Sequence, residues 1–367
     1  MEASGHYYTV YFVSLAVGFD DDVAREFAFY AQLPDQLDKL DAADLELKYL
    51  LETKAIRLRS TVKALQFKPV PLPISAPGYQ PYVPIPSIGP TEDGLKAKQE
   101  LNTENYWRVL IERTLHALTG KNAKEEQNKT VEALRKTYSE NFSYAKFGFL
   151  LHRLGDTFAH TRFNGELDEY HFEPENSRVN EMLYRADFHE TGEHGHGLDG
   201  THPDHPWQRK TLFMNYLGKL YEVLYDLCVN EQKSPFPKAT CNKAYSFTEV
   251  KAVFENAIRA SSKSYREGID SLSKVDRQQY KRFQPSSGLN DNIKALELNA
   301  QANFKLNLFL EIIGNTNIKN PSTYSPEKDE LMTYTELKKK YPNIPSFEKI
   351  EKYINEIQKE TATSMEK

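Results

Sequence analysis

The sequence has few cysteines and lacks a long apolar run. Its two cysteines, Cys228 and Cys241, can form at most one disulfide with each other, and their separation matches no common metal-site spacing. No uninterrupted apolar stretch reaches the ~20 residues that a membrane-spanning helix needs. The apolar stretch from Tyr7 to Val17 has no Lys or Arg ahead of it and runs into acidic residues, so we do not expect a signal peptide. We therefore expect a soluble protein with no integral membrane segment, either cytoplasmic or exported by a signal-less route.

An excess of positive charge is also missing. The 47 Lys and Arg are outnumbered by 52 Asp and Glu, which gives a formal net charge of −5. No global positive field exists to hold a polyanion, so binding to nucleic acid would need a local basic patch. Hydrophobic residues make up 39% of the 367-residue chain, which is typical of globular proteins and allows one large domain or two ordinary ones.

Most long segments carry apolar residues at steps of three and four, which predicts a mainly α-helical protein, a helical bundle. The expected helices cover residues 20–33, 42–65, 102–120, 124–138, 142–163, 207–227, 247–272, 290–313 and 347–359. Pro34 is expected to end the first of them, because proline disrupts a helix interior. The last is rich in Lys and Glu, and we expect it to be a solvated surface helix.

Two segments break the helical pattern. A Pro-rich arm at 67–95 holds eight prolines between Pro69 and Pro90, which is too dense for a helix. It is interpreted either as a packed surface connection or as a lid over a substrate. The second segment, a His-rich loop at 164–206, is rich in Gly, His, Asp and Glu. We divide the chain into a helical metal-binding core, 1–230, and a helical C-terminal extension, 231–367, expected to pack on the core.

Histidine is unevenly distributed along the chain. Of the ten histidines, eight lie between His152 and His205. His152, Asp156 and His160 follow one another at four-residue steps, which places them on one face of the expected helix. Imidazole nitrogen and carboxylate oxygen are both good zinc donors, so this face predicts a metal site. The alternative is a helix face whose side chains hydrogen-bond to one another or to solvent.

The His-rich loop offers further donors. Glycines between them allow side chains two or more residues apart to converge on one ion, and His194, His196 and Asp204 are the preferred ligands. His202 remains open, as does the alternative of a flexible loop that chelates weakly or not at all. The other histidines are interpreted as surface residues, namely His171, His189 and His205.

The order of these donors resembles that of the zinc-dependent phospholipase C and single-strand nuclease superfamily. The matching positions are His6, Asp35, His116, His152, Asp156, His160, His194 and His196, with Asp204 further on. Four stretches look closer still to poorly characterised bacterial relatives of these enzymes, namely 6–9, 30–35, 151–163 and 194–204. The resemblance covers about residues 1–230. It implies a helical protein that holds two or three zinc ions, or other divalent metals.

This resemblance also implies an activity. Clustered divalent ions support hydrolysis of a phosphoester by a metal-bound hydroxide, which makes the protein a phospholipase C-like phosphodiesterase. Asp156 is the expected bridging ligand, and Asp35 is expected to bind metal or to orient the attacking water. Arg153 and Arg162 flank the metal-binding helix and are candidates for a phosphate contact. The substrate is expected to be a phospholipid or a nucleotide.

Two other functions fit the same residues. One is a His-Asp-type metal phosphohydrolase, although Arg153 follows His152 where that class has an adjacent His-Asp doublet. The other is a non-catalytic, metal-stabilised helical module for binding or for toxin or effector delivery, in which every ligand set is closed to water. An open coordination position would separate the catalytic site from the structural one.

Overall fold

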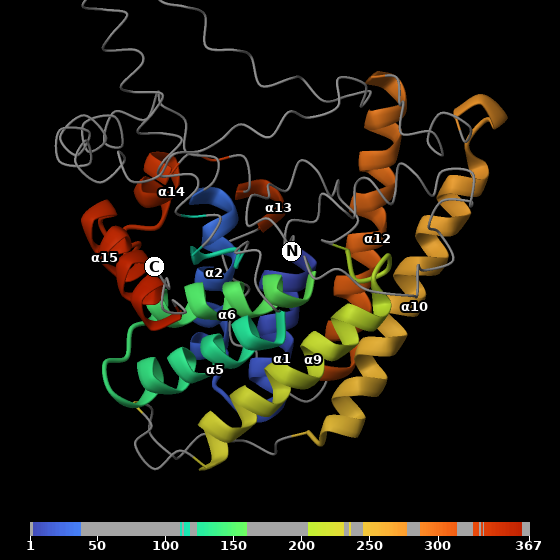
Figure 1. Cartoon of the computed structure of the whole chain (residues 1–367). Coiled ribbons are helices and arrows are strands. Elements are labelled where there is room, and N and C mark those ends of the chain that lie inside the picture. Colours follow the sequence, from blue (N-terminus) through green and yellow to red (C-terminus); the bar gives the residue numbers. More distant parts are fainter. Residues whose placement is uncertain are drawn as a thin grey trace, which may run out of the picture.

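A computed structural model describes residues 3–37, 111, 114–117, 123–159, 205–230, 235, 245–276, 287–313, 326–329, 332 and 334–361. Within these ranges every regular element is a helix, which confirms the mainly α-helical prediction (Figure 1). The helix expected at 42–65, the Pro-rich arm and the His-rich loop up to residue 204 lie outside the described residues. None of the described helices is both long and apolar enough to cross a bilayer.

The N-terminal segment forms a continuous helical rod that is buried along its whole length. A π-helical stretch, η1 (Ser4–Thr9), leads directly into α1 (Val10–Val17), and every residue of both is buried. The rod ends at Gly18, whose φ of 108° is a left-handed conformation that glycine adopts without steric cost. The apolar run at 7–17 is therefore a core helix of this fold.

The second helix, α2 (Asp21–Leu37), is longer than predicted. We expected Pro34 to end it, and that prediction is wrong because the helix continues through Pro34 to Leu37. Proline removes one backbone hydrogen bond, but α2 packs along α6 and buries Leu33 and Leu37, both about 1% exposed. This packing outweighs the lost bond, and it keeps Asp35 on the helix.

The central helix of the molecule is α6 (Tyr144–Ala159), in which every residue from Ala145 to Ala159 is buried. It lies at the centre of the bundle in Figure 1, with α5 (Ala123–Ser139) and α9 (Lys210–Tyr225) beside it. Contacts with α2, η1 and α15 cover its remaining sides. The predicted helices 124–138 and 142–163 correspond to α5 and α6, although residues 160–163 are outside the described part.

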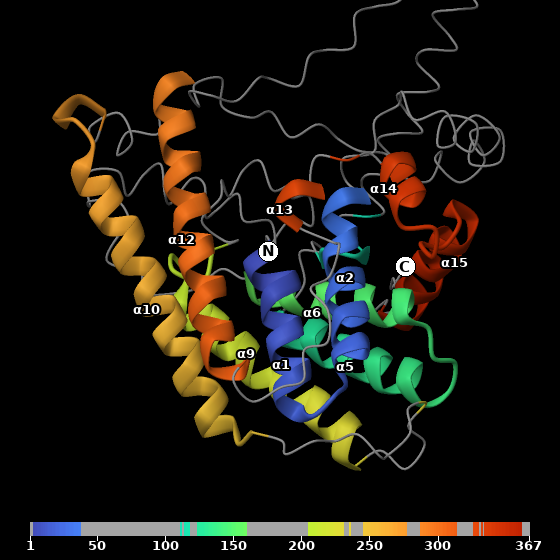
Figure 2. The same ribbon diagram turned by 180° about the vertical axis from the view of Figure 1, so that it is seen from behind.

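Two groups of helices flank this centre on opposite sides (Figure 2). One group is a helix pair, α10 (Phe247–Ser271) and α12 (Ser287–Ile313), which contacts α9, α1 and η1. A capping box between Ser246 and Glu249 fixes the start of α10, where the sequence predicted it. The other group holds α14 (Tyr334–Lys340) and α15 (Phe347–Thr361), whereas the short α13 (Pro326–Asp329) lies between α12 and α2 in Figure 2.

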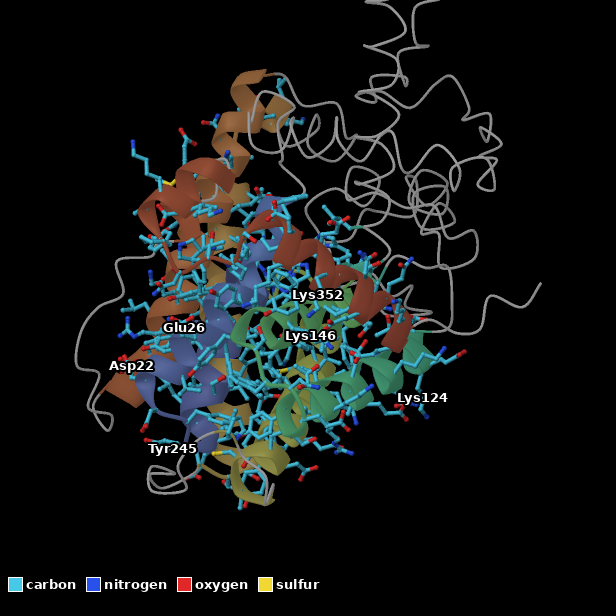
Figure 3. All side chains as sticks on the ribbon, turned by 90° about the vertical axis from the view of Figure 1, so that its left-hand side faces the viewer. Asp22, Glu26, Lys124, Lys146, Tyr245 and Lys352 are labelled. Atoms are coloured by element: carbon cyan, nitrogen blue, oxygen red, sulfur yellow. The ribbon has the colours of Figure 1, made fainter. Side chains whose placement is uncertain are left out.

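The prediction that the last helix is solvated is wrong. Ile350, Ile354 and Ile357 form a buried stripe along α15, which packs on α5 and α6. Lys146 of α6 lies beneath this helix (Figure 3) and makes ion pairs with two α15 carboxylates, those of Glu356 at 3.1 Å and Glu360 at 3.0 Å. The high content of Lys and Glu described only the outer face of the helix.

Candidate metal centre

The structure brings together all of the predicted ligands that it describes. His6 comes from η1, Asp35 from the last turn of α2, His116 from the short segment 114–117, and His152 and Asp156 from α6. The remaining predicted ligands, His160, His194, His196 and Asp204, lie outside the described residues.

Asp156 is the centre of this cluster. Its Oδ1 lies 3.1 Å from His6 Nε2, whereas its Oδ2 lies 2.8 Å from His116 Nδ1 and 3.1 Å from His152 Nε2. His152 Nε2 is also 3.0 Å from His116 Nδ1 and 3.7 Å from Asp35 Oδ1. Two overlapping sets of donor atoms, each within 4.8 Å of one another, are those of His6, Asp35 and His152 and those of His116, His152 and Asp156.

The local sequence of α6 fixes two of these ligands. His152 and Asp156 are four residues apart, so they share one helix face. His152 Nδ1 donates to the backbone carbonyl of Ala31 in α2, at 2.7 Å. Because a neutral imidazole carries one proton, this bond leaves Nε2 as the lone-pair nitrogen, and that nitrogen is the one directed at Asp156 and Asp35. A backbone carbonyl that orients a ligand histidine in this way is a common feature of metal sites.

His6 is held by an unusual helix. The π-helical stretch is closed by a hydrogen bond from Thr9 Oγ1 to the Ser4 carbonyl, at 2.6 Å. Such stretches are rare and occur frequently at functional sites. The His6 ring stacks on His152, with ring centroids 3.6 Å apart. Although fully buried, neither ring nitrogen of His6 makes a hydrogen bond within the described part of the chain.

The segment that carries His116 is anchored from the opposite side of α6. Arg153 donates to the carbonyl of Thr114 at 2.6 Å and to Thr130 Oγ1 at 3.2 Å, and it pairs with Glu126 of α5. These partners occupy the Arg153 guanidinium on the side of α5, so the phosphate contact for which Arg153 was a candidate is wrong. It follows His152 on the helix and therefore points away from the ligand face. Arg162, the other predicted phosphate contact, is outside the described residues.

Burial sets the charge state of the cluster. The side chains of His6, His116, His152 and Asp156 are fully buried, and that of Asp35 is 16% exposed. Burial holds the pKa of His6 well below its usual value and lowers the pKa of His152 to about 4. Burial alone would raise the pKa of Asp156, but its close contacts with the surrounding imidazoles, including the hydrogen bond from His116, hold it well below its usual range. At neutral pH this arrangement is ready for a cation, because metal ligands must be deprotonated.

One further histidine differs from its prediction. His205 was expected at the surface, but it is buried at the start of α9, where its ring stacks on Trp207 with centroids 4.5 Å apart. Its Nε2 lies 3.7 Å from Glu297 Oε1 of α12. The backbone N–H groups of Gln208 and Arg209 both donate to the His205 carbonyl. The residue therefore belongs to the contact that the segment preceding α9 makes with α12.

Two residues near the cluster gave no signal in the sequence. Tyr216 of α9 is buried, and its burial and then the charge of Asp156 raise the pKa of its hydroxyl. In the sequence it is only one of several apolar positions along the helix, so nothing marked it as a site residue. Gly148 has no side chain at a position where the backbone of α2 lies too close to α6 for a Cβ atom. From the sequence alone, an isolated glycine in a helix has no single interpretation.

The fold and this cluster together define a mainly α-helical protein with a buried set of His and Asp donors that could hold a metal ion. The chain belongs to a family of unknown function, DUF6765, whose model matches residues 1–359. The match therefore includes the C-terminal helices as well as those that carry the cluster. No curated protein and no solved structure matches the chain.

Proposed function

We propose that the cluster binds divalent metal ions, zinc above all, and that the protein is a metal-dependent, phospholipase C-like hydrolase of phosphoester bonds. One observation carries the metal site. The lone-pair nitrogen of His152 lies 3.1 Å from Asp156 Oδ2 and 3.7 Å from Asp35 Oδ1. His152 Nε2 therefore faces a carboxylate oxygen in each of the two donor sets, and a cation held by either set turns the repulsion between these acceptors into attraction.

His6 supports the same proposal. A buried polar atom normally has a hydrogen-bond partner, and leaving it without one costs about 1–3 kcal/mol. Both nitrogens of His6 are in this position within the described residues, and Nε2 is directed at Asp156 Oδ1. Coordination of a metal by one of them explains why the sequence keeps an imidazole there.

The number of donors favours more than one ion. A structural zinc takes four protein ligands, whereas His6, Asp35, His116, His152 and Asp156 already supply five side chains. Asp156 directs one oxygen at His6 and the other at His116 and His152, as a carboxylate shared between two ions does. Clustered divalent ions, when bound, activate water for attack and offset the charge of a phosphate ester.

The residues of the cluster have two different roles in this proposal. Asp156 and the histidines hold the ions, and their complete burial keeps the surroundings of low polarity, in which charge interactions are strong. Asp35 is the one ligand in the described set with exposed surface, and Gln32 Nε2 donates to its Oδ2 at 2.6 Å. We assign Asp35 to the substrate side of the cluster, where it binds metal or orients the attacking water.

Burial also favours a second candidate function. Four of the ligands have no exposed side-chain surface, as in a closed structural site that leaves no position for water. A metal-stabilised binding module would have the same ligands and no turnover. Both functions require bound metal, but only the hydrolase would turn over a substrate.

The test is an activity assay on matched variants. The parent protein with added zinc is offered a panel of phosphodiesters and phosphomonoesters, including phospholipid vesicles and dinucleotides. We expect turnover of at least one class and its loss in Asp156→Asn, because the amide keeps the shape of the carboxylate but not the charge that holds the cations. Zinc content should fall with activity, while circular dichroism stays nearly unchanged.

Asp226→Asn is the matched control. Asp226 pairs with Arg135 at 3.0 Å, and both side chains are exposed by 40% or more. The same substitution there should leave zinc content and turnover as in the parent, because exposed pairs contribute little. Full activity in Asp156→Asn would show that this residue is not a metal-binding catalytic ligand. A zinc-loaded parent without activity on any substrate would favour the binding module.

A further inference from the structure

Tyr216 is completely buried, yet its hydroxyl has no hydrogen-bond partner among the described residues. Its side chain is 0% exposed, and its Oη makes no hydrogen bond to any residue that the structure describes. A phenylalanine would fill the same space without a polar atom to satisfy. Burying a hydroxyl without a partner is unfavourable, so its retention needs an explanation.

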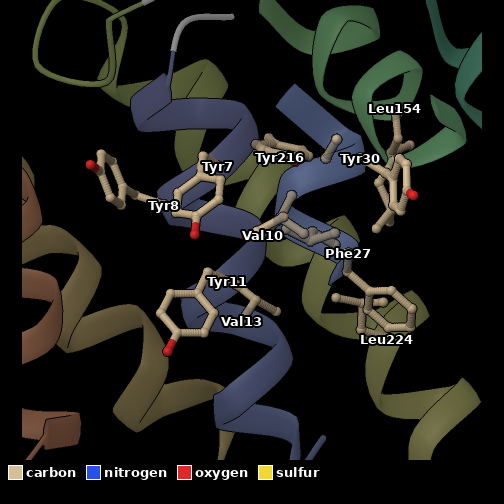
Figure 4. Packing of buried hydrophobic residues seen from close by; sticks show 14 of the residues in the cluster. Tyr7, Tyr8, Val10, Tyr11, Val13, Phe27, Tyr30, Leu154, Tyr216 and Leu224 are labelled. Atoms are coloured by element: carbon tan, nitrogen blue, oxygen red, sulfur yellow. The ribbon is translucent and has the colours of Figure 1, made fainter. Parts of the chain in front are cut away.

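The position of Tyr216 gives that explanation. It lies on α9, which packs against both α6, the helix that carries Asp156, and α1, which continues from the η1 stretch that carries His6. Its ring is 5.9 Å from that of Phe158, two residues beyond Asp156. Figure 4 shows Tyr216 in the same buried cluster as Tyr7, Val10 and Phe27. Burial and then the charge of Asp156 raise the pKa of Tyr216, so the hydroxyl keeps its proton and is a donor.

We propose that the Tyr216 hydroxyl donates a hydrogen bond to an oxygen of the phosphoryl group held at the metal cluster. This proposal rests on the proposed function. A protonated phenol does not suit a metal ligand, which would have to be the phenolate. Once the oxygens of Asp156 face cations, the acceptor left for a buried donor is an anionic oxygen of the bound substrate or product. Tyr216 is then a substrate-binding residue that recognises phosphate rather than metal.

The experiment measures binding of inorganic phosphate, a product of phosphomonoester hydrolysis, to the zinc-loaded protein by calorimetry. For Tyr216→Phe we expect an unchanged zinc content and a phosphate affinity about tenfold weaker, as for loss of a hydrogen bond to a charged group. The melting temperature of the zinc-free variant should equal or exceed that of the zinc-free parent, because the unused hydroxyl is gone.

Tyr221→Phe is the control on the same helix. The Tyr221 hydroxyl donates to the Tyr245 carbonyl at 2.7 Å, so its removal should lower the melting temperature and leave phosphate affinity unchanged. Equal phosphate affinity in Tyr216→Phe and the parent overturns the role of Tyr216 alone. Loss of zinc together with phosphate also overturns it, since the hydroxyl would then serve the metal. A zinc-loaded parent that neither binds phosphate nor hydrolyses any ester overturns both proposals.

Discussion

At the residue scale, the important property of Asp156 is negative charge without exposed surface. The imidazoles around it form close contacts, but burial keeps His6 and His152 neutral near pH 7, so they solvate the carboxylate without cancelling its charge. Burying an uncompensated charge is expensive. A divalent cation removes this cost, which is why the cluster should be more stable with metal than without.

The neutral histidines predict how the metal-free protein responds to acid. The pKa values of His6 and His152 lie below 6.5 in the folded state, about 4 for His152, and near 6.5 when unfolded. Between these values the unfolded state binds more protons, so stability is complete above about pH 6.5 and falls as the pH drops toward 4. Urea unfolding of chelator-treated protein between pH 7.5 and pH 5 measures this loss, and His152→Gln should reduce it. A parent whose stability stays flat over that range would contradict the assigned charge states.

Arg153 predicts a separation of stability from metal affinity. Arg153→Met leaves Glu126 buried without its partner, which should cost about 3–5 kcal/mol of unfolding free energy. The double change Arg153→Met with Glu126→Leu should recover most of that loss. Zinc affinity should nevertheless stay reduced, because nothing then holds the Thr114 carbonyl next to His116. Denaturant unfolding and zinc titration measure the two quantities. Parent-like zinc affinity in the double variant would show that Arg153 does not position His116.

At the element scale, the crossing of α2 and α6 determines the geometry of the site. At Gly148 a Cβ atom would lie 2.6 Å from the Tyr30 carbonyl carbon and closer still to Tyr30 Cβ. Only glycine permits this approach. It brings the Ala31 carbonyl to His152 and, one turn further along α2, Asp35 to the cluster.

Gly148→Ala should therefore affect both stability and metal binding. The added methyl group forces α2 and α6 apart, at a cost of about 1–3 kcal/mol, and zinc affinity should fall because Asp35 moves with α2. Gly218→Ala in α9 is the control, since its Cβ would meet nothing nearer than Phe247 Cζ at 3.6 Å, and alanine favours a helix. Thermal unfolding and zinc titration of both variants measure the changes in stability and in zinc affinity. Equal behaviour of the two variants would contradict the role given to this crossing.

Local patterns predicted the elements well where packing agreed with them. The apolar period placed α10 within a residue of its observed ends. The end of α2 was predicted wrongly because burial against α6 outweighs the tendency of Pro34 to end a helix. The buried face of α15 was missed because the Lys and Glu of its outer face dominate the composition. The π-helical stretch that carries His6 was not predicted from the sequence.

At the scale of the whole molecule, the site depends on the complete fold. Its ligands come from η1, α2, the segment at 114–117 and α6, which are far apart in the sequence. The four-residue spacing of His152 and Asp156 was visible locally, whereas the convergence of His6, Asp35 and His116 on them was expected only from the resemblance. Arg153 and His205 were misinterpreted, because exposure cannot be judged before the packing is known.

The residues beyond 230 also belong to this assembly. The helix pair α10 and α12 contacts η1, α1 and α9, while α15 packs on α5 and α6. Together they enclose the helices that carry the ligands from two sides (Figures 1 and 2). The family match extends to residue 359 and so includes these helices. Bound metal and the fold should therefore stabilise one another.

The most direct test of the metal centre is the zinc content of the purified protein, measured together with its melting temperature before and after chelation. We predict at least one zinc per chain. Its removal should lower the melting temperature, because an ion that binds only the folded state adds to stability, and added zinc should restore it. A protein that contains no divalent metal, binds none on addition and melts at the same temperature with and without chelator would contradict the central claim.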